Sequence, residues 1–287
     1  MLSQQHIDGY RNEGFACVQE FVSAARIAAF RDEVEAITGR STVADHDAER
    51  VEMEPGQGPQ GNKIRRIYEP CEYYACFRDF AESAEILDAV EQLVGSDILL
   101  HYSKLNMKPA ELGSVVEWHQ DLSFYPLTNP DSLAVLIYLD DADEQNGCLK
   151  VLPGRHREPL MDHTAGGVFQ GCIAGEVDEA EVENMVGKAG TAIFMNGMTP
   201  HASAQNLGSK PRRTLIVSYR AADAMPIHIG NRTAGTEAFT RQVRGQPARQ
   251  ARFGFDRLSI PVYGDKEASL YELQAQSRES RQNAAAD

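Results

Sequence analysis

The stretch "DILLHYSKLNM", residues 97–107, marks the point at which the character of this 287-residue chain changes. It is the first of several short runs that are rich in β-branched and aromatic residues and bounded by turn-forming residues. The later runs are SLAVLIYLDDA (132–142), GCLKVLPG (147–154), GTAIFMNG (190–197) and RTLIVSYR (213–220). This pattern predicts a mainly β fold with flanking helices, in which the core is a double-stranded β-helix (a cupin-like jelly roll).

The residues before this point predict the flanking helices. Three segments carry a helical pattern and end at a glycine, and one short run between them predicts a strand. The helical segments are SQQHIDGYRNEG (3–14), SAARIAAFRDEVEAITGR (23–40) and SAEILDAVEQLVG (83–95), and the strand is FACVQEF (15–21). Ser23 is a plausible N-cap for the second helix.

Two polar segments show no periodicity. Residues 41–62 end in a run of Gly, Pro and Gln, which predicts a mobile loop of the kind that often covers a site. The tail after Tyr271 is polar and is expected to fray. The basic cluster KIRR (63–66) follows the loop, where we expect a solvated face; contact with an anionic substrate at the mouth of a cavity is the alternative.

Length and composition favour one domain. The 42% share of hydrophobic residues is enough to fill a single large core. We therefore expect one domain over residues 1–287, with N-terminal helices over about 1–96, the jelly-roll core over about 97–222 and a C-terminal extension over about 223–287.

Charge and cysteine content restrict partners and location. The chain has 28 Lys and Arg against 42 Asp and Glu, a formal net charge of −14, which disfavours binding to nucleic acid or to anionic membranes. Its five cysteines lack C-x-x-C spacing, so neither a disulfide framework nor a zinc cluster is indicated. Without a signal-peptide pattern at the start, we expect a cytoplasmic protein. The oligomeric state stays open.

A pair of metal donors lies in "EWHQDLSFYP", residues 117–126. In an extended strand, residues two apart point to the same face, so His119 and Asp121 project together while Gln120 points away. A His-x-Asp pair occurs by chance in many proteins, and a surface histidine beside a solvated aspartate is the alternative. A third donor is therefore needed from elsewhere in the chain.

His201 is the candidate third donor. It follows the apolar run 190–197 and its Asn-Gly turn, where a strand resumes and directs a side chain inward. We expect the other six histidines to be surface or packing residues: His6, His46, His101, His156, His163 and His228. Two imidazoles and one carboxylate are the ligand set of non-haem Fe(II) oxygenases, which leaves positions open for oxygen chemistry.

Arg212 and Ser203 add a second element to this site. Arg212 lies eleven residues after His201 at the start of the run 213–220, and an arginine beside a metal pocket can clamp a carboxylate. Ser203 shares the face of His201 in an extended segment and can donate to the same carboxylate. The alternative is a solvated pair, Arg212 and Arg213, of which only one should point inward.

These motifs carry a resemblance to a known family. The segments WHQDLSFYP (118–126) and EQNGCLKVLPGRHR (144–157), with His201-Ala-Ser203 and Arg212 after them, resemble the phytanoyl-CoA dioxygenase family of Fe(II)/2-oxoglutarate-dependent oxygenases. The resemblance spans most of the chain to about Arg220.

The resemblance implies the roles of seven residues. The iron ligands would be His119, Asp121 and His201, and Arg212 and Ser203 would hold the distal carboxylate of 2-oxoglutarate. Asn106 matches a position that contacts the keto-acid end of the cosubstrate in relatives, and Tyr125 matches an aromatic position near it. For these last two, an outward polar residue and a core aromatic are the respective alternatives.

The resemblance also implies the reaction. Fe(II), 2-oxoglutarate and O2 would oxidise a small or medium-sized organic metabolite, such as an amino-acid-like or natural-product compound, and release succinate and CO2. Because a carboxylate occupies position 121, where related halogenases have a small residue, hydroxylation is favoured; desaturation, ring formation and epoxidation at the same site are the alternatives. The rival interpretations are a metal-dependent jelly-roll enzyme that does not use 2-oxoglutarate and a non-catalytic binding protein with the same fold.

Overall fold

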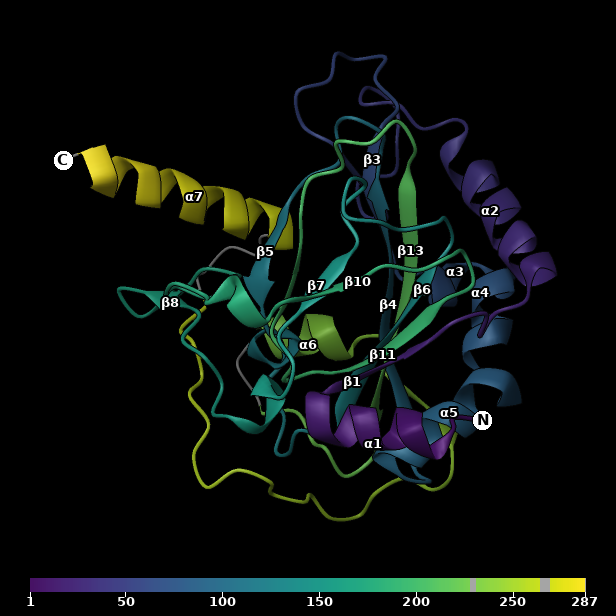
Figure 1. Cartoon of the computed structure of the whole chain (residues 1–287), viewed down its shortest axis with the longest axis vertical. Coiled ribbons are helices and arrows are strands. Elements are labelled where there is room, and N and C mark those ends of the chain that lie inside the picture. The colour runs from purple at the N-terminus through teal and green to yellow at the C-terminus, as the bar shows by residue number, and fades with distance from the viewer. Residues whose placement is uncertain (228–230, 264–268, 287) are drawn as a thin grey trace.

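A large antiparallel sheet forms the centre of the fold in the computed structural model, which describes residues 1–227, 231–263 and 269–286 (Figure 1). Its strands lie in the order β1 (Phe15–Val18), β11 (Ala192–Asn196), β6 (Ser132–Tyr138), β13 (Arg212–Ala221), β4 (Ile98–Lys108), β3 (Ile64–Tyr68) and β2 (Val51–Met53). β14 (Arg241–Arg244) also pairs with β4.

A smaller sheet packs against one face of the large one. It consists of β10 (Glu183–Met185), β7 (Leu149–Val151), β12 (His201–Ser203) and β5 (Val116–His119), in that order. A separate hairpin is formed by β8 (Thr164–Ala165) and β9 (Val168–Phe169). The two facing sheets make the jelly roll that the β-rich runs predicted.

The central strand β6 shows why these runs are apolar throughout. Val135 and Ile137 belong to the core beneath the helices, whereas Leu136 and Tyr138 belong to the core between the two sheets. A strand that is buried on both faces cannot alternate apolar and polar residues as a half-exposed strand does.

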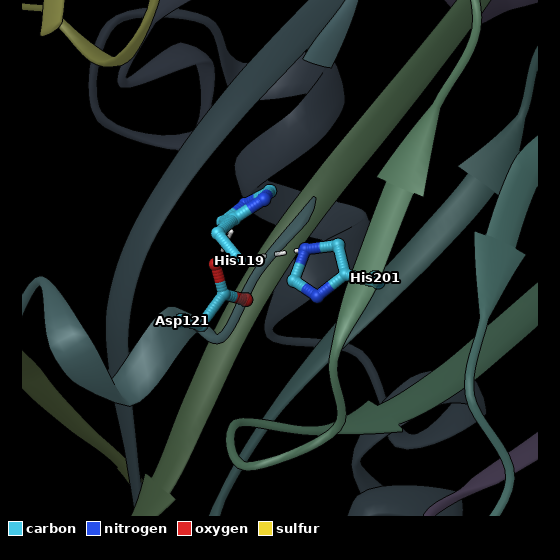
Figure 2. A group of neighbouring side chains, drawn as sticks. All are labelled: His119, Asp121 and His201. Atoms are coloured by element: carbon cyan, nitrogen blue, oxygen red, sulfur yellow. Dashed lines mark ion pairs between the residues drawn. The ribbon is translucent and has the colours of Figure 1, made fainter. Parts of the chain in front are cut away.

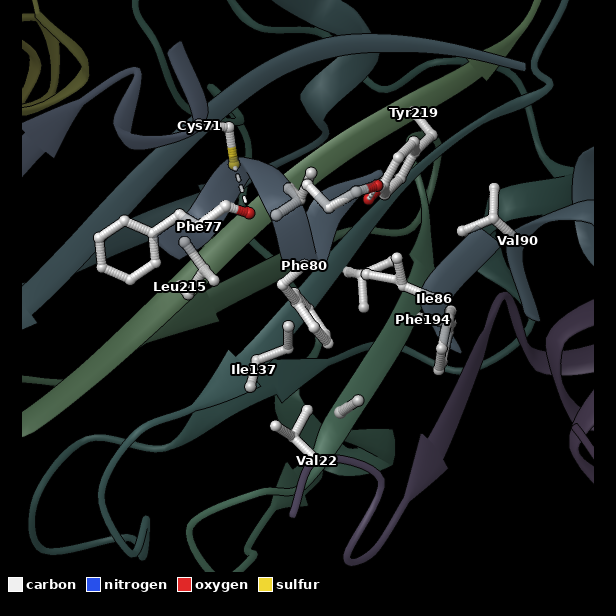
Figure 3. Close-up of a cluster of buried hydrophobic side chains, with 14 of the residues drawn as sticks. Val22, Cys71, Phe77, Phe80, Ile86, Val90, Ile137, Phe194, Leu215 and Tyr219 are labelled. Atoms are coloured by element: carbon white, nitrogen blue, oxygen red, sulfur yellow. Dashed lines mark hydrogen bonds between the residues drawn. The ribbon is translucent and has the colours of Figure 1, made fainter. Parts of the chain in front are cut away.

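Helices cover the other face of the large sheet. They are α1 (Gln4–Glu13), α2 (Ala24–Thr38), α3 (Pro70–Tyr73), α4 (Ala75–Ala81) and α5 (Ala84–Val94). Figure 3 shows Phe80 of α4 and Ile86 of α5 near Ile137 and Phe194 of the sheet. The three helices predicted from residues 3–14, 23–40 and 83–95 are confirmed.

The prediction of a loop over residues 41–62 is wrong for part of that segment. Residues 51–53 form β2, which pairs with β3. Glu54, next to β2, is buried and accepts hydrogen bonds from the Ser114 backbone N–H (2.9 Å) and hydroxyl. A strand of three residues is too short to show a two-residue period, so its pairing partner decides its structure.

The prediction of a solvated face over KIRR (63–66) is wrong for three of its four residues. Lys63 is exposed, but residues 64–66 lie at the start of β3, where Ile64 packs into the core and Arg66 is only 5% exposed. The side chain of Arg65 is 13% exposed and pairs with Glu52. β3 is therefore an inner strand of the large sheet, covered by β2 on one side and by β4 on the other.

The tail does not fray as predicted, because residues 270–286 form α7 (Leu270–Ala286), which contacts β5. Gln274 is fully buried: its Oε1 accepts from the Glu117 backbone N–H (2.9 Å) and its Nε2 donates to the Gly171 carbonyl (2.8 Å). A further helix, α6 (Asn231–Glu237), precedes β14. Within the residues that the structure describes, no helix combines the length and apolar character needed to traverse a bilayer.

Candidate active site

Three buried donors meet at one end of the smaller sheet. His119 ends β5 and His201 begins β12, and the antiparallel register places them opposite each other. Asp121 begins a short 3-10 turn (Asp121–Ser123) directly after β5. Figure 2 shows the two imidazoles and the carboxylate turned toward one another. One ligand atom from each lies within 4.8 Å of the other two, so the group can hold a metal ion.

The protonation states of the two histidines suit metal binding. His119 Nδ1 lies 2.8 Å from the Glu117 carbonyl and His201 Nδ1 lies 3.0 Å from the Thr199 carbonyl. Because a carbonyl can only accept, each Nδ1 carries the proton and each Nε2 has a free lone pair. Both Nε2 atoms face Asp121 Oδ1 at 3.9 Å, which is too long for a hydrogen bond and leaves space between the donors.

Burial keeps both imidazoles neutral. Burial, and then the proximity of His201, hold the pKa of His119 well below its usual value. Burial also lowers the pKa of His201, although the carboxylate of Asp121 opposes this effect. Neutral imidazole is the form that binds a metal, so the site needs no deprotonation at neutral pH.

Three hydrogen bonds fix Gln120, the residue between His119 and Asp121. The backbone N–H of Gln120 donates to His163 Nε2 (3.0 Å). Its side chain donates to the Met198 carbonyl (2.6 Å) and accepts from the Met161 backbone N–H (2.9 Å). Gln120 is fully buried, so this segment holds His119 and Asp121 in a set orientation.

A cavity beside the donors, here called the inner pocket, lies between the two sheets. Besides the three donors, four charged or polar residues line it: Lys104, Asn106, Ser203 and Arg212. The rest of its lining comes from the two sheets and from the first residue of α7: Val116, Ala134, Leu136, Tyr138, Leu149, Met195, Ala202, Ile216 and Leu270. The predicted clamp residues Arg212 and Ser203 thus reach the same cavity as His119, Asp121 and His201.

Arg212 is a buried cation in this pocket. It is 5% exposed, and its guanidinium donates to the Gly147 carbonyl through Nε (3.0 Å) and Nη2, and to Thr214 Oγ1 through Nη1 (2.8 Å). Among the described residues no carboxylate pairs with it. Ser203 is 6% exposed, and its hydroxyl has no hydrogen-bond partner among the described residues.

Arg213 points to the other side of β13. It forms a bidentate pair with Asp140 (both contacts 2.9 Å) and also contacts Glu35 (2.8 Å). Only Arg212 lines the inner pocket, as expected of one member of this pair.

The two remaining predicted residues lie in different places. Asn106 lines the inner pocket, and its Oδ1 accepts from Arg66 Nε (3.0 Å). Tyr125 does not line the inner pocket; its ring packs edge-on against His101 (centroids 4.7 Å apart) and Tyr102 (5.5 Å). It borders a second cavity, which shares His119 and Asp121 with the inner pocket.

This second cavity, here called the outer pocket, has a volume of roughly 260 Å³. Its lining includes four residues already named in the sequence analysis: His119, Asp121, Arg66 and Tyr125. The other lining residues were not singled out there: Tyr68, Glu69, Tyr102, Ser103, Lys104, Phe124, Gly235, Thr236, Ser269 and Leu270. Lys104 could have been found from Asn106, because residues two apart on a strand share a face. Residue 66 was linked to a cavity only through the alternative interpretation of the KIRR cluster, and nothing in the sequence links residue 236 to the site.

Three of the other histidines make contacts that stabilise the fold: His163, His101 and His6. His163 uses Nδ1 toward the Met161 carbonyl (2.7 Å) and Nε2 toward Gln120. His101 is buried, with Nε2 3.0 Å from Glu237, and His6 belongs to the capping box at the start of α1. His228 lies outside the described residues.

The comparisons with known proteins agree with this geometry. The family model described as phytanoyl-CoA dioxygenase (PhyH) matches residues 10–214. A probable alpha-ketoglutarate-dependent hypophosphite dioxygenase from Stutzerimonas stutzeri is 33% identical over 234 residues, which cover 79% of this chain and 81% of the relative. An ectoine dioxygenase from Nocardia farcinica is 25% identical over 261 residues, 80% of this chain and 86% of the relative.

Solved structures share the fold. EctD from S. alaskensis with bound Fe aligns with a TM-score of 0.65 at 23% identity, over 88% of each chain. ThoJ, described as a non-heme monooxygenase in its apo form, aligns with a TM-score of 0.65 at 21% identity, over 96% of this chain and 99% of its own.

These matches favour an iron- and 2-oxoglutarate-dependent enzyme over a jelly-roll enzyme that does not use 2-oxoglutarate and over a non-catalytic binding protein. This chain belongs to the phytanoyl-CoA dioxygenase family of Fe(II)- and 2-oxoglutarate-dependent dioxygenases.

Proposed function

We propose that His119, Asp121 and His201 bind Fe(II), and that Arg212 and Ser203 bind the distal carboxylate of 2-oxoglutarate in the inner pocket. Asn106 then lies at the keto-acid end of the cosubstrate. The enzyme hydroxylates a small or medium-sized organic metabolite in the outer pocket, where Tyr125 contacts it, and couples this to the formation of succinate and CO2.

The observation that carries this proposal is the buried charge of Arg212. A buried arginine without an acidic partner is unfavourable unless a ligand supplies the opposite charge. 2-Oxoglutarate is a dianion, and one cavity joins Arg212 to the metal donors, so one carboxylate would pair with Arg212 while the other end meets the donors. This cavity has a volume of roughly 40 Å³ and has to widen to admit the cosubstrate. The free hydroxyl of Ser203 supplies a second donor to the same carboxylate.

The chain's residues position the reactants and keep water out. When bound, the iron and 2-oxoglutarate supply O2-dependent oxidative decarboxylation. The carbonyls of Glu117 and Thr199 keep the imidazole Nε2 lone pairs directed inward, and Leu136 and Ile216 line the inner pocket with apolar surface. The carboxylate of Asp121 occupies the position that a halide would need, which supports hydroxylation.

The size of the outer pocket supports a small substrate. Its volume of roughly 260 Å³ lies just below the usual range of small-molecule sites, about 300–1,000 Å³. The named substrates of the relatives, hypophosphite and ectoine, are also small molecules. Screening candidate compounds for substrate-dependent succinate release will decide whether the substrate is an amino-acid-like or a natural-product compound.

We also propose that the catalytic unit is one domain over the whole chain, located in the cytoplasm. The two pockets take residues from all three expected segments, for example Arg66, Lys104 and Leu270, which supports a single unit. The five cysteines are free thiols, which supports a reducing compartment.

Anaerobic titration tests the proposed function. Fe(II) and 2-oxoglutarate added to the purified protein should produce a weak visible charge-transfer band that saturates at one equivalent of each. Replacing Fe(II) with Zn(II) should give no band, because this redox-inert ion does not transfer an electron to the ligand. Replacing 2-oxoglutarate with succinate should also give no band, because succinate lacks the keto group that completes the chelate. A folded protein that binds Fe(II) but never develops the band would overturn the proposal.

A further inference from the structure

We propose that the outer pocket selects metabolites that carry an oxyanion group, such as a phosphonate or a carboxylate, and that Arg66 and Lys104 bind this group. The inference deepens the proposed function, because it assumes that the outer pocket is the substrate site of that enzyme.

The pairing of β3 with β4 creates a polar row that faces the outer pocket. Its register places Arg66 opposite Asn106 and Tyr68 opposite Lys104. Directly opposed residues of an antiparallel pair share a face, and residues two apart share it too, so these side chains project together. The alternate positions Ile67 and Leu105 are fully buried in the core on the opposite face.

Arg66 is a buried cation that forms no close ion pair. Its Nε donates to Asn106, but its buried Nη2 has no hydrogen-bond partner, and no ion pair joins it to a carboxylate in the described part of the chain. Glu52 is its register partner on β2, but this carboxylate is bonded to Arg65 (2.6 Å), the Tyr68 hydroxyl (2.8 Å) and the Ser269 hydroxyl (2.6 Å). A bound oxyanion would supply both the missing acceptor and the missing charge.

Lys104 lies at the boundary of the two pockets. It lines both, and its Nζ lies 5.1 Å from the centre of the Tyr102 ring without an ion pair among the described residues. Arg66 lines only the outer pocket, so it is separate from the place where Arg212 would hold 2-oxoglutarate.

The charge balance of the outer pocket favours an anion. Apart from Asp121, which faces the metal site, its acidic lining residue is Glu69, whose Oε2 accepts from the Ser103 backbone N–H (2.9 Å). Burial raises the pKa of Glu69 to about 7, so this carboxyl is partly protonated at neutral pH. Two cations therefore face less than one full negative charge, and a neutral substrate would leave the cations uncompensated.

Calorimetry with three probes of similar size tests the inference. The full-length protein, saturated with Fe(II) and 2-oxoglutarate without oxygen so that the inner pocket is filled, is titrated with propylphosphonate, butyrate and the neutral butyramide. We expect one or both anions to bind at least tenfold more tightly than butyramide, and the better of the two identifies the preferred oxyanion.

Three variants test whether Arg66 causes the preference for anions. Arg66→Gln should remove the preference for anions, whereas Arg66→Lys should keep part of it because the charge stays. Arg213→Gln is the matched control: it removes a guanidinium that already pairs with Asp140 and lines neither pocket, so the anion preference should not change. Affinity for 2-oxoglutarate should stay within threefold of wild type in all three.

The outcomes separate the two proposals. Butyramide binding as tightly as the anions, or an anion preference that survives Arg66→Gln, overturns the oxyanion inference even if the charge-transfer band forms. If the band never forms but Arg66-dependent anion binding is found in the absence of 2-oxoglutarate, the proposed function fails and the oxyanion site stands.

Discussion

The inner and the outer pocket share two of the three donors, yet they are built from different parts of the fold. Both include Lys104, His119, Asp121 and Leu270. The inner pocket is otherwise formed by strands of the two facing sheets. The outer pocket instead draws on β3, α6 and the residues at the start of α7.

Under the proposed function, this difference places the reaction in the inner pocket and the selection of the substrate in the outer pocket. The inner pocket combines a fixed donor set and a buried arginine inside the packed sandwich, where hydrogen bonds restrict each group. The outer pocket takes Arg66 from β3, shares Lys104 of β4 with the inner pocket, and is lined in addition by residues of α6 and of the start of α7. A jelly roll can thus keep one reaction while the elements around it change the substrate.

Removing a shared donor should disable both pockets and gives the largest expected effect. Asp121→Ala should lower 2-oxoglutarate-dependent succinate formation by more than about 100-fold, since the loss of groups that merely support metal ligands already costs 10–100-fold. Succinate release under air measures it. Asp8→Ala, which removes an exposed acid from α1, is the control. Coupled turnover in Asp121→Ala would refute the ligand assignment.

The inner pocket alone should respond to Arg212→Ala. Truncating one partner of a buried charge pair costs about 2–5 kcal/mol, so the Kd for 2-oxoglutarate should rise by about 30-fold or more. Fe(II) affinity should stay within threefold, which anaerobic titration of each component measures. Arg213→Ala removes the neighbouring arginine, which pairs with Asp140 outside the pocket, and should leave 2-oxoglutarate binding intact. Equal losses in both variants would point to a structural role.

The rigidity of the donor segment can be tested at Gln120. Gln120→Leu keeps the volume of the side chain but removes its bonds to Met198 and Met161. Because such supporting bonds orient metal ligands, we expect Fe(II) affinity to fall about 10-fold. Circular dichroism and thermal unfolding check that the fold persists. Unchanged Fe(II) affinity would mean that backbone contacts alone orient His119 and Asp121.

The outer pocket should contribute a pH dependence of stability through Glu69. Its pKa is raised to about 7 by burial, so between about pH 4.5 and 7 the folded state binds more protons than the unfolded state. The stability from this group is present below that range and is lost as the pH rises through it. Allowing for partial exposure, wild type should lose about 1 kcal/mol more than Glu69→Gln between pH 4.5 and 8.

Urea unfolding at a series of pH values measures this difference. Glu69→Gln is neutral at every pH and should give a flatter profile, while a control change at the exposed Asp8 should follow wild type. A profile for Glu69→Gln that parallels wild type would assign the pH dependence to other groups.

Local sequence patterns were sufficient for most of the sandwich and for the metal donors. Strand runs such as 132–138 and 212–221 are long and apolar, and helix α2 has both a capping serine and an apolar stripe. The His-x-Asp spacing and the positions of His201 and Arg212 place donors on strands that a jelly roll brings together. These are properties of neighbouring residues, which a sequence displays directly.

The sequence by itself determined the fold class, the family and the residues that can serve as iron ligands, because periodicity and short motifs carry that information. Only the tertiary structure decided that Arg66 is buried, that residues 51–53 form a strand and that α7 docks through Gln274. Each of these depends on a partner far away in the chain: Asn106 for Arg66, β3 for β2, and Glu117 for Gln274. The outer pocket is made of such long-range contacts, and no local sequence pattern predicts them.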